Sequence, residues 1–465
     1  MKNITLTLYA FHLKQGLGDS PETTKNQGVK LWESLVKLSN VYPFPELQNL
    51  KSQLVSYTAD PQGNYQYQPE KEETITGECL TPQQEVITLS QIPTSQGFKL
   101  TGEIEPYLLN DTYCLTLTLN PENTDTELDL SALTAFHSDQ LITGVTADLG
   151  KVLVFYGEQN YLLKSPNRKE AKEWATALCA NTNLNPEFRG EFTLFNCPGF
   201  WFDASGLTLW ILLAKPNQFE GKKFSENAPM FRGLLWSYSK INSTYRDAQA
   251  AYKNGKTYYN KLEKKMEDFS RIYQKTSSQK NSSQRLKHLD TMIESVPQDL
   301  LYYHCCLRDI KAHYTTIKTN IQNFQTALGH LIAAGNKLDV WSNLAEKTYP
   351  RYLQQVERYL EYLEPGKDLF SELINTIRAT AEIEQAKSNQ KLQDQIQSVG
   401  VGIAAGAIVA STSGLITQPW GLPNGQKIDP PFMLPHPFLI ALFASVFCSV
   451  GAWWLATKEI QKRRK

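Results

Sequence analysis

A heptad repeat of apolar residues runs through the middle of the chain and constrains the fold more than any other feature. Its positions alternate at spacings of four and three, and they are Leu234, Tyr238, Ile241, Tyr245, Ala248, Tyr252, Gly255, Tyr259, Leu262, Met266, Phe269 and Tyr273. Such a repeat places one apolar seam on a helix of about 60 Å, which needs a partner along its length. A second repeat follows, from Leu300 to Leu331. We therefore predict a long antiparallel helical hairpin or coiled coil over residues 226–366.

The first 225 residues show a different periodicity. Alternation of apolar and polar residues favours strands, and two segments have helical spacing. The predicted strands are 4–13, 98–104, 113–119, 151–156, 161–163, 192–196 and 207–214, and the predicted helices are 28–38 and 167–181. The sequence contains no Walker A, Rossmann, G-x-S-x-G or H-E-x-x-H motif. We predict an α+β domain over 1–225, located in the cytosol, and we expect that the protein is not an enzyme.

Two apolar segments near the carboxyl end are each about 20 residues long, which is the length that crosses a hydrocarbon core of about 30 Å. The first is rich in Gly, Ala and Ser, and the second ends at Trp453 and Trp454 before a basic tail. We predict a transmembrane hairpin with spans at 398–417 and 438–457, an external loop at 418–437 and a cytoplasmic tail at 458–465. The five basic residues of the tail predict that both termini are cytoplasmic, in a two-span protein of the plasma membrane whose partner is the lipid bilayer.

A stalk helix is predicted at 367–397. The sequence Glu364-Pro365-Gly366 is predicted to end the helix before it, and the stalk continues into the first span without a break.

Composition adds two limits. Lys plus Arg and Asp plus Glu each total 47, so the net charge is zero and we expect no direct binding of DNA or RNA. The seven cysteines have no paired spacing, which fits a reducing compartment.

The order of these segments resembles the CorA family of divalent-cation channels. The match in sequence lies in the tail, where Ala452-Trp453-Trp454-Leu455 precedes Lys462-Arg463-Arg464-Lys465. The family's Gly-Met-Asn filter is absent, because Leu415-Ile416-Thr417-Gln418-Pro419-Trp420-Gly421 stands at its place. The resemblance implies a homopentamer with the first spans around a pore, without magnesium selectivity. Divergent CorA-like proteins also serve as membrane effectors beside type III CRISPR systems, so it further implies a nucleotide or divalent-cation ligand and a role in antiviral defence.

The candidate functional residues lie in the predicted first span. Small residues recur every four positions at Ser398, Gly402, Gly406, Ala410 and Gly414, which indicates a helix-packing stripe. A second line, predicted to face a pore, comprises Asp394, Ser398, Val401, Ala405, Ile408 and Thr412. We expect no resident cofactor, and we interpret His304, Cys305 and Cys306 as helix packing rather than a metal site. The acidic cluster Glu70, Glu72 and Glu73 is interpreted as a solvated loop, and Trp201 with Phe202 as core.

These features favour an oligomeric CorA-like channel gated by its cytosolic domain. Three alternatives remain open: a magnesium transporter of the CorA family, a membrane-anchored coiled-coil scaffold without a pore, and an enzyme tethered by a hairpin. The small-residue stripe and the weakly apolar first span favour a channel over an anchor.

Overall fold

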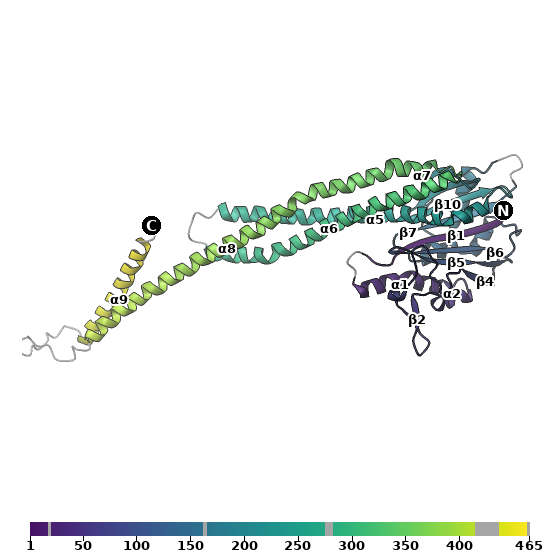
Figure 1. Ribbon diagram of the computed structural model, residues 1–465. Helices are drawn as coiled ribbons and strands as arrows, with labels where there is room; N and C mark the ends of the chain where they lie inside the picture. The colour runs from purple at the N-terminus through teal and green to yellow at the C-terminus, as the bar shows by residue number, and fades with distance from the viewer. Residues whose placement is uncertain (17–19, 161–164, 275–281, 414–436, 463–465) are drawn as a thin grey trace, which may run out of the picture. The chain divides into compact units, whose positions relative to one another are not determined.

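The computed structural model describes residues 1–16, 20–160, 165–274, 282–413 and 437–462 (Figure 1). Contacts within the chain divide it into two compact units. Unit 1 consists of Met1–Gly255 and Cys305–Leu363, and unit 2 consists of Lys256–His304 and Glu364–Lys465. Three long helices have residues in both units: α5 (Gly221–Gln274), α6 (Ser282–Ala333) and α8 (Tyr349–Ser413).

Unit 1 is built on a mixed sheet of eight strands in the order β4-β5-β6-β1-β7-β10-β9-β8. Neighbouring strands are antiparallel except β7 and β10, which are parallel. The strands are β1 (Lys2–Leu13), β4 (Ile87–Pro93), β5 (Lys99–Leu109), β6 (Thr112–Pro121), β7 (Gly150–Glu158), β8 (Glu187–Leu194), β9 (Cys197–Ala204) and β10 (Leu207–Ala214). A small hairpin, β2 (Tyr57–Ala59) and β3 (Tyr65–Tyr67), is separate from this sheet. The predicted α+β class of this region is confirmed.

Short helices cover one face of the sheet. They are α1 (Pro21–Leu38), α2 (Pro45–Gln48), α3 (Ser138–Gly144) and α4 (Arg168–Leu178). The start of α1 is fixed locally, because Pro21 occupies its first position and the Ser20 hydroxyl accepts from the Thr23 amide at 3.2 Å. Trp32 and Leu35 of α1 pack in one core with Leu6 and Leu8 of β1.

The long helices cover the opposite face, and Figure 1 shows α5 on the other side of the sheet from α1 and α2. Trp341 of α7 (Asp339–Asn343) lies 4.5 Å from Trp210 and 5.6 Å from Trp201, between ring centroids. Because both faces are covered, every residue of β10 is buried, and all of them except Thr208 are apolar. Trp201 and Phe202 are therefore core, as predicted.

Within unit 1, α5 and α8 are joined by stacked tyrosines. Tyr245 stacks on Tyr352 with centroids 3.8 Å apart, and one heptad later Tyr252 stacks on Tyr359 at 4.1 Å. The residue numbers increase in both helices from the first stacked pair to the second, so α5 and α8 run in the same direction. Gly255, the gap in the heptad, lies where Leu363 approaches, and a Cβ there would be 2.8 Å from Leu363 Cδ1. The seam thus has α8 as a partner in addition to the predicted α6.

In unit 2, α5 and α6 pack as antiparallel neighbours. Lys265 Nζ donates to Asp299 at 2.6 Å and to the Ser295 carbonyl at 2.9 Å. The predicted helix break at Pro365-Gly366 is wrong, because α8 passes through both residues. Gly366 lets aromatic rings pack against the helix, since a Cβ there would lie 2.7 Å from both Tyr259 and Tyr303.

The predicted transmembrane hairpin is also wrong. Within the described ranges, no helix has both the length and the apolar character that a membrane crossing requires. The first predicted span, 398–417, overlaps the last described residues of α8, up to Ser413, which are largely Gly, Ala and Ser. The second overlaps α9 (Pro437–Lys462), in which side chains are described from Leu442 on. The last turns of α9 contain charged residues, among them Lys458 and Glu459. The predicted loop, 418–437, falls almost wholly outside the described residues.

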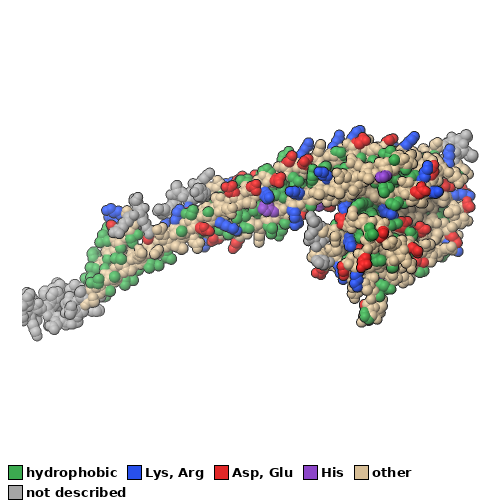
Figure 2. Space-filling model, viewed as in Figure 1, with side chains coloured by type: hydrophobic (Ala, Val, Ile, Leu, Met, Phe, Trp, Pro, Cys, Tyr) green, Lys and Arg blue, Asp and Glu red, His purple; other side chains and the backbone are tan. Residues whose placement is uncertain are grey.

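The same finding overturns the predictions that depended on two spans. These are the membrane channel and the two-span location in the plasma membrane with both termini in the cytoplasm. Helix α9 nevertheless carries exposed apolar side chains, including Phe443, Phe447 and Trp454. Figure 2 shows hydrophobic side chains gathered on the surface of this helix.

Candidate functional site

The predicted packing stripe lies against α9 of the same chain, within unit 2. A Cβ at Gly406 would be 1.8 Å from Ser449 Oγ, and one at Gly402 would be 2.9 Å from the Ser449 carbonyl oxygen. The Ser445 hydroxyl donates to the Gly406 carbonyl at 2.8 Å. Ser398 is buried. Packing of this stripe between copies of the chain stays a prediction.

The described residues of the predicted pore line differ in exposure. Val401 and Ile408 are 50% and 64% exposed, whereas Asp394 and Ala405 are half-buried. Ala410 and Thr412 lie in α8, although their side chains are not described, and Gly414 lies outside the described residues. Pore lining by these residues depended on a transmembrane channel, for which the described helices supply no span.

Gly406→Leu should separate α8 from α9, because a side chain at this position would occupy the space of Ser449. Overpacking of this kind costs about 1–3 kcal/mol. Hydrogen exchange of peptides from 442–462 should accelerate roughly tenfold or more. Gly400→Leu is the matched control, since a Cβ at Gly400 meets nothing within 4 Å. Equal exchange in the two variants would mean that the close approach at Gly406 does not hold α9.

The structure also bears on two residue clusters that the sequence analysis singled out. In the described part of the chain, no group of three His, Cys, Asp or Glu residues could hold a metal ion. Glu70 and Glu73 are exposed, as expected of a solvated loop. Glu72 is not, because its side chain is fully buried and paired with Lys14 at 2.5 Å. The solvated-loop interpretation is therefore wrong for Glu72.

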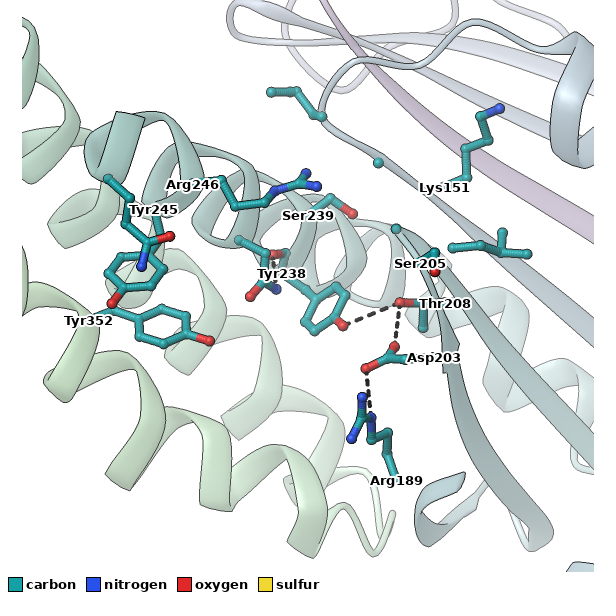
Figure 3. Close-up of a pocket in the computed structure, with 16 residues that line it drawn as sticks. Lys151, Arg189, Asp203, Ser205, Thr208, Tyr238, Ser239, Tyr245, Arg246 and Tyr352 are labelled. Carbon is teal, nitrogen blue, oxygen red and sulfur yellow. Dashed lines mark hydrogen bonds and ion pairs between the residues drawn. The ribbon is translucent and has the colours of Figure 1, made fainter. Parts of the chain in front are cut away.

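The candidate site is a pocket of about 450 Å³ in unit 1, on the sheet face that α5 covers (Figure 3). It lies where β7 and β10 begin, beside the turn between β9 and β10, and helices α5 and α8 close it. Its polar lining residues are Arg189, Asp203, Ser205, Thr208, Tyr238, Ser239, Asn242, Tyr245, Arg246, Gln249 and Tyr352.

Asp203 organises one wall of the pocket. Its Oδ1 accepts from the Trp201 indole at 3.0 Å and from the Thr208 hydroxyl at 3.1 Å, and its Oδ2 accepts from Arg189 Nε at 3.2 Å. Thr208 Oγ1 also lies 3.2 Å from the Tyr238 hydroxyl. Arg189 has a second carboxylate partner, Glu187, at 3.1 Å. The charge of Arg189 is thus already balanced within the protein.

Arg246 differs from Arg189. It lies on an exposed part of α5, and among the described residues it has neither an ion-pair partner nor a hydrogen-bond partner. Figure 3 shows its guanidinium extending beside Ser239 toward the turn at Ser205. The side chains that face the pocket therefore include two guanidinium groups and one carboxylate, which leaves one positive charge in excess.

Lys151 contributes to the pocket wall without adding its charge. Its amine points away from the other labelled side chains (Figure 3) and donates to the Ile142 carbonyl at 2.5 Å, on the face that α3 covers. Burial lowers the pKa of Lys151 to about 8, because a low-dielectric environment disfavours the ammonium form.

Aromatic side chains form the third wall. The rings of Tyr245 and Tyr352 are parallel within 1°. Burial raises the pKa of Tyr238, and the nearby carboxylate of Asp203 raises it further. Burial raises the pKa of Tyr245 and of Tyr352 as well. These hydroxyls therefore stay protonated at neutral pH and can donate hydrogen bonds.

Little in the sequence indicates this site. Tyr238 and Tyr245 belong to the heptad repeat, and Arg189, Asp203 and Arg246 belong to no recognised motif. No protein-family model matches the chain, and no curated protein matches it.

Proposed function

We propose that unit 1 is a ligand-binding module that takes a small organic anion with a planar ring, of the nucleotide type, in the pocket around Arg246. The observation that carries this proposal is an unpaired guanidinium beside a stacked tyrosine pair, at a pocket that opens to solvent and has polar and aromatic lining residues.

The charge balance supports an anion. Arg189 is neutralised by Asp203 and Glu187, so a bound phosphate or carboxylate would pair with Arg246. A guanidinium presents several N–H donors in one plane and suits both groups. The Ser205 and Ser239 hydroxyls, near which the guanidinium lies in Figure 3, can donate to the same anion.

The remaining walls suit a planar ring. Tyrosine faces stack on aromatic ligands, and the amides of Asn242 and Gln249 offer donors and acceptors for a ring edge. A volume of about 450 Å³ lies within the usual range for small-molecule sites. Because α5 and α8 both line the pocket, a ligand there would contact two helices that also have residues in unit 2.

Isothermal titration calorimetry with adenosine 5′-monophosphate tests the proposal, with adenosine and inorganic phosphate as partial probes. We expect the monophosphate to bind more tightly than either partial probe, because each lacks one of the two recognised groups. Arg246→Ala should weaken binding of the monophosphate about 10- to 100-fold, the range for a lost hydrogen bond to a charged group.

Arg308→Ala is the matched control, because Arg308 is an exposed arginine of the same unit that pairs with Asp309 and does not line the pocket. It should bind like the unmodified protein. Equal losses in the two variants, or tighter binding of adenosine than of the monophosphate, would contradict an anion site at Arg246.

A further inference from the structure

Helix α8 carries a line of exposed apolar side chains within unit 2, which we call the α8 seam. Its members are 46% to 66% exposed in the described part of the chain, and they are Leu392, Ile396, Val399 and Ile403. Helix α9 packs on α8 at Gly402 and Gly406, where a Cβ would approach Ser449. The α8 seam stays exposed with α9 in place, so it is a separate surface of the helix.

The spacing of the α8 seam indicates what shape of partner would cover it. Its members follow one another at intervals of four, three and four residues, which is a heptad pattern. A line with this period stays on one side of a helix when that helix supercoils around another helix. Together with Asn389, three residues before Leu392, the line extends over about 21 Å of α8. The partner of the α8 seam is therefore expected to be a helix.

The residue types of the α8 seam favour two parallel helices. Ile396 and Ile403 occupy heptad position a, and Leu392 and Val399 occupy position d. β-Branched residues at a with Leu at d favour parallel dimers. Asn389, which is also exposed, occupies the preceding a position. A single Asn at a fixes the register of a dimer, because it pairs with the Asn of a partner helix that is aligned with it.

The residues beside the α8 seam favour a partner of identical sequence. Positions e and g, which face each other across a coiled coil, carry no charge from 388 to 402, and their residues are Ser388, Gln393, Gln395, Gly400 and Gly402. The nearest charged residues, Lys387, Lys391 and Asp394, occupy the outer positions c and f. Two aligned copies thus bring no like charges together, whereas a different partner is usually selected by opposite charges at e and g.

We propose that two copies of this chain form a dimer in which their α8 helices pair in parallel through residues 389–403. Each copy presents the same surface to the other, as the twofold symmetry of most dimers requires.

Sedimentation equilibrium of the full chain over roughly a hundredfold range of concentration tests the dimer. Ile396→Glu places two carboxylates opposite one another in the seam, so it should weaken dimerisation roughly 100-fold or more. The circular dichroism of the variant should stay unchanged, because Ile396 is exposed in the single chain. Ile383→Glu is the matched control, since Ile383 is an exposed isoleucine of the same helix outside the seam. It should dimerise like the unmodified protein.

Cysteine cross-linking tests the parallel register. Cys305 and Cys448, the two cysteines that are not buried, are first replaced by serine. A cysteine at a d position meets its own counterpart only when the helices are parallel and aligned, so Val399→Cys should form a disulfide-linked dimer on mild oxidation. Val401→Cys is the matched control, because Val401 is exposed at the outer position f of the same helix. It should stay largely uncross-linked.

Four results would overturn the proposal. The chain could stay monomeric at every concentration, or Ile383→Glu could weaken the dimer as much as Ile396→Glu does. Cross-linking through Val401→Cys and not through Val399→Cys would place another side of α8 in the interface. A monomeric chain that floats with phosphatidylcholine vesicles, and loses this binding in Ile396→Glu, would assign the α8 seam to a lipid surface instead of a second copy.

Discussion

Glu72→Ala should lower the free energy of unfolding of unit 1 by about 3–5 kcal/mol, the cost of leaving one partner of a buried ion pair without the other. The Glu72 carboxylate is fully buried, and it accepts from Lys14 at 2.5 Å, from Ser56 at 2.5 Å and from the Tyr113 hydroxyl at 2.6 Å. The substitution would leave the Lys14 ammonium, only 14% exposed, without a counter-charge.

Urea unfolding followed by tryptophan fluorescence would measure this loss, because Trp32 packs against Tyr113 with centroids 5.1 Å apart. Glu73→Ala is the matched control, since Glu73 is the adjacent residue and is exposed. It should change stability by less than about 0.5 kcal/mol. If the two midpoints shifted equally, the buried carboxylate would not hold this loop to the sheet.

Trp341→Ala should cost a similar amount, about 3–5 kcal/mol, because it removes the largest side chain from a fully packed site. Trp341 is fully buried, and four aromatic rings surround it: Trp201, Trp210, Tyr238 and Phe324, with centroids between 4.5 and 5.9 Å away. These rings belong to the sheet, α5 and α6. The substitution should therefore loosen the long helices from the sheet within unit 1.

Near-ultraviolet circular dichroism and the urea midpoint should report this change together. Tyr362→Ala provides the control, because Tyr362 is also aromatic and lies on α8 of the same unit but is 70% exposed. An aromatic signal retained in Trp341→Ala, with a midpoint like that of Tyr362→Ala, would contradict the central role of this ring.

Features with a local periodicity could be predicted from the sequence. The heptads from Leu234 and from Leu300 correspond to α5 and α6, and the alternating segment 4–13 corresponds to β1. The strand β9 was missed because Pro198-Gly199 resembles a turn, whereas in the sheet Pro198 pairs with Thr193 at the start of the strand. The predicted strand at 161–163 lies outside the described residues.

Features that depend on distant partners could not be predicted. A proline and a glycine usually end a helix, but α8 continues through Pro365 because Gly366 packs against Tyr259 and Tyr303. A carboxylate between charged neighbours suggests a solvated loop, yet Glu72 is buried by residues 16 to 58 positions away. The pocket around Arg246 likewise draws on β8, β9, β10, α5 and α8.

The most direct test of the proposed anion site is nuclear magnetic resonance of the chain with ¹³C-labelled tyrosine rings, titrated with adenosine 5′-monophosphate. Single Tyr→Phe variants would assign the signals. We predict shifts for Tyr245, Tyr352 and Tyr238, which line the pocket, and none for the stacked pair Tyr258 and Tyr302 of unit 2. The shifts should disappear in Arg246→Ala. Shifts confined to tyrosines outside this pocket, or the same shifts in Arg246→Ala, would contradict the proposal.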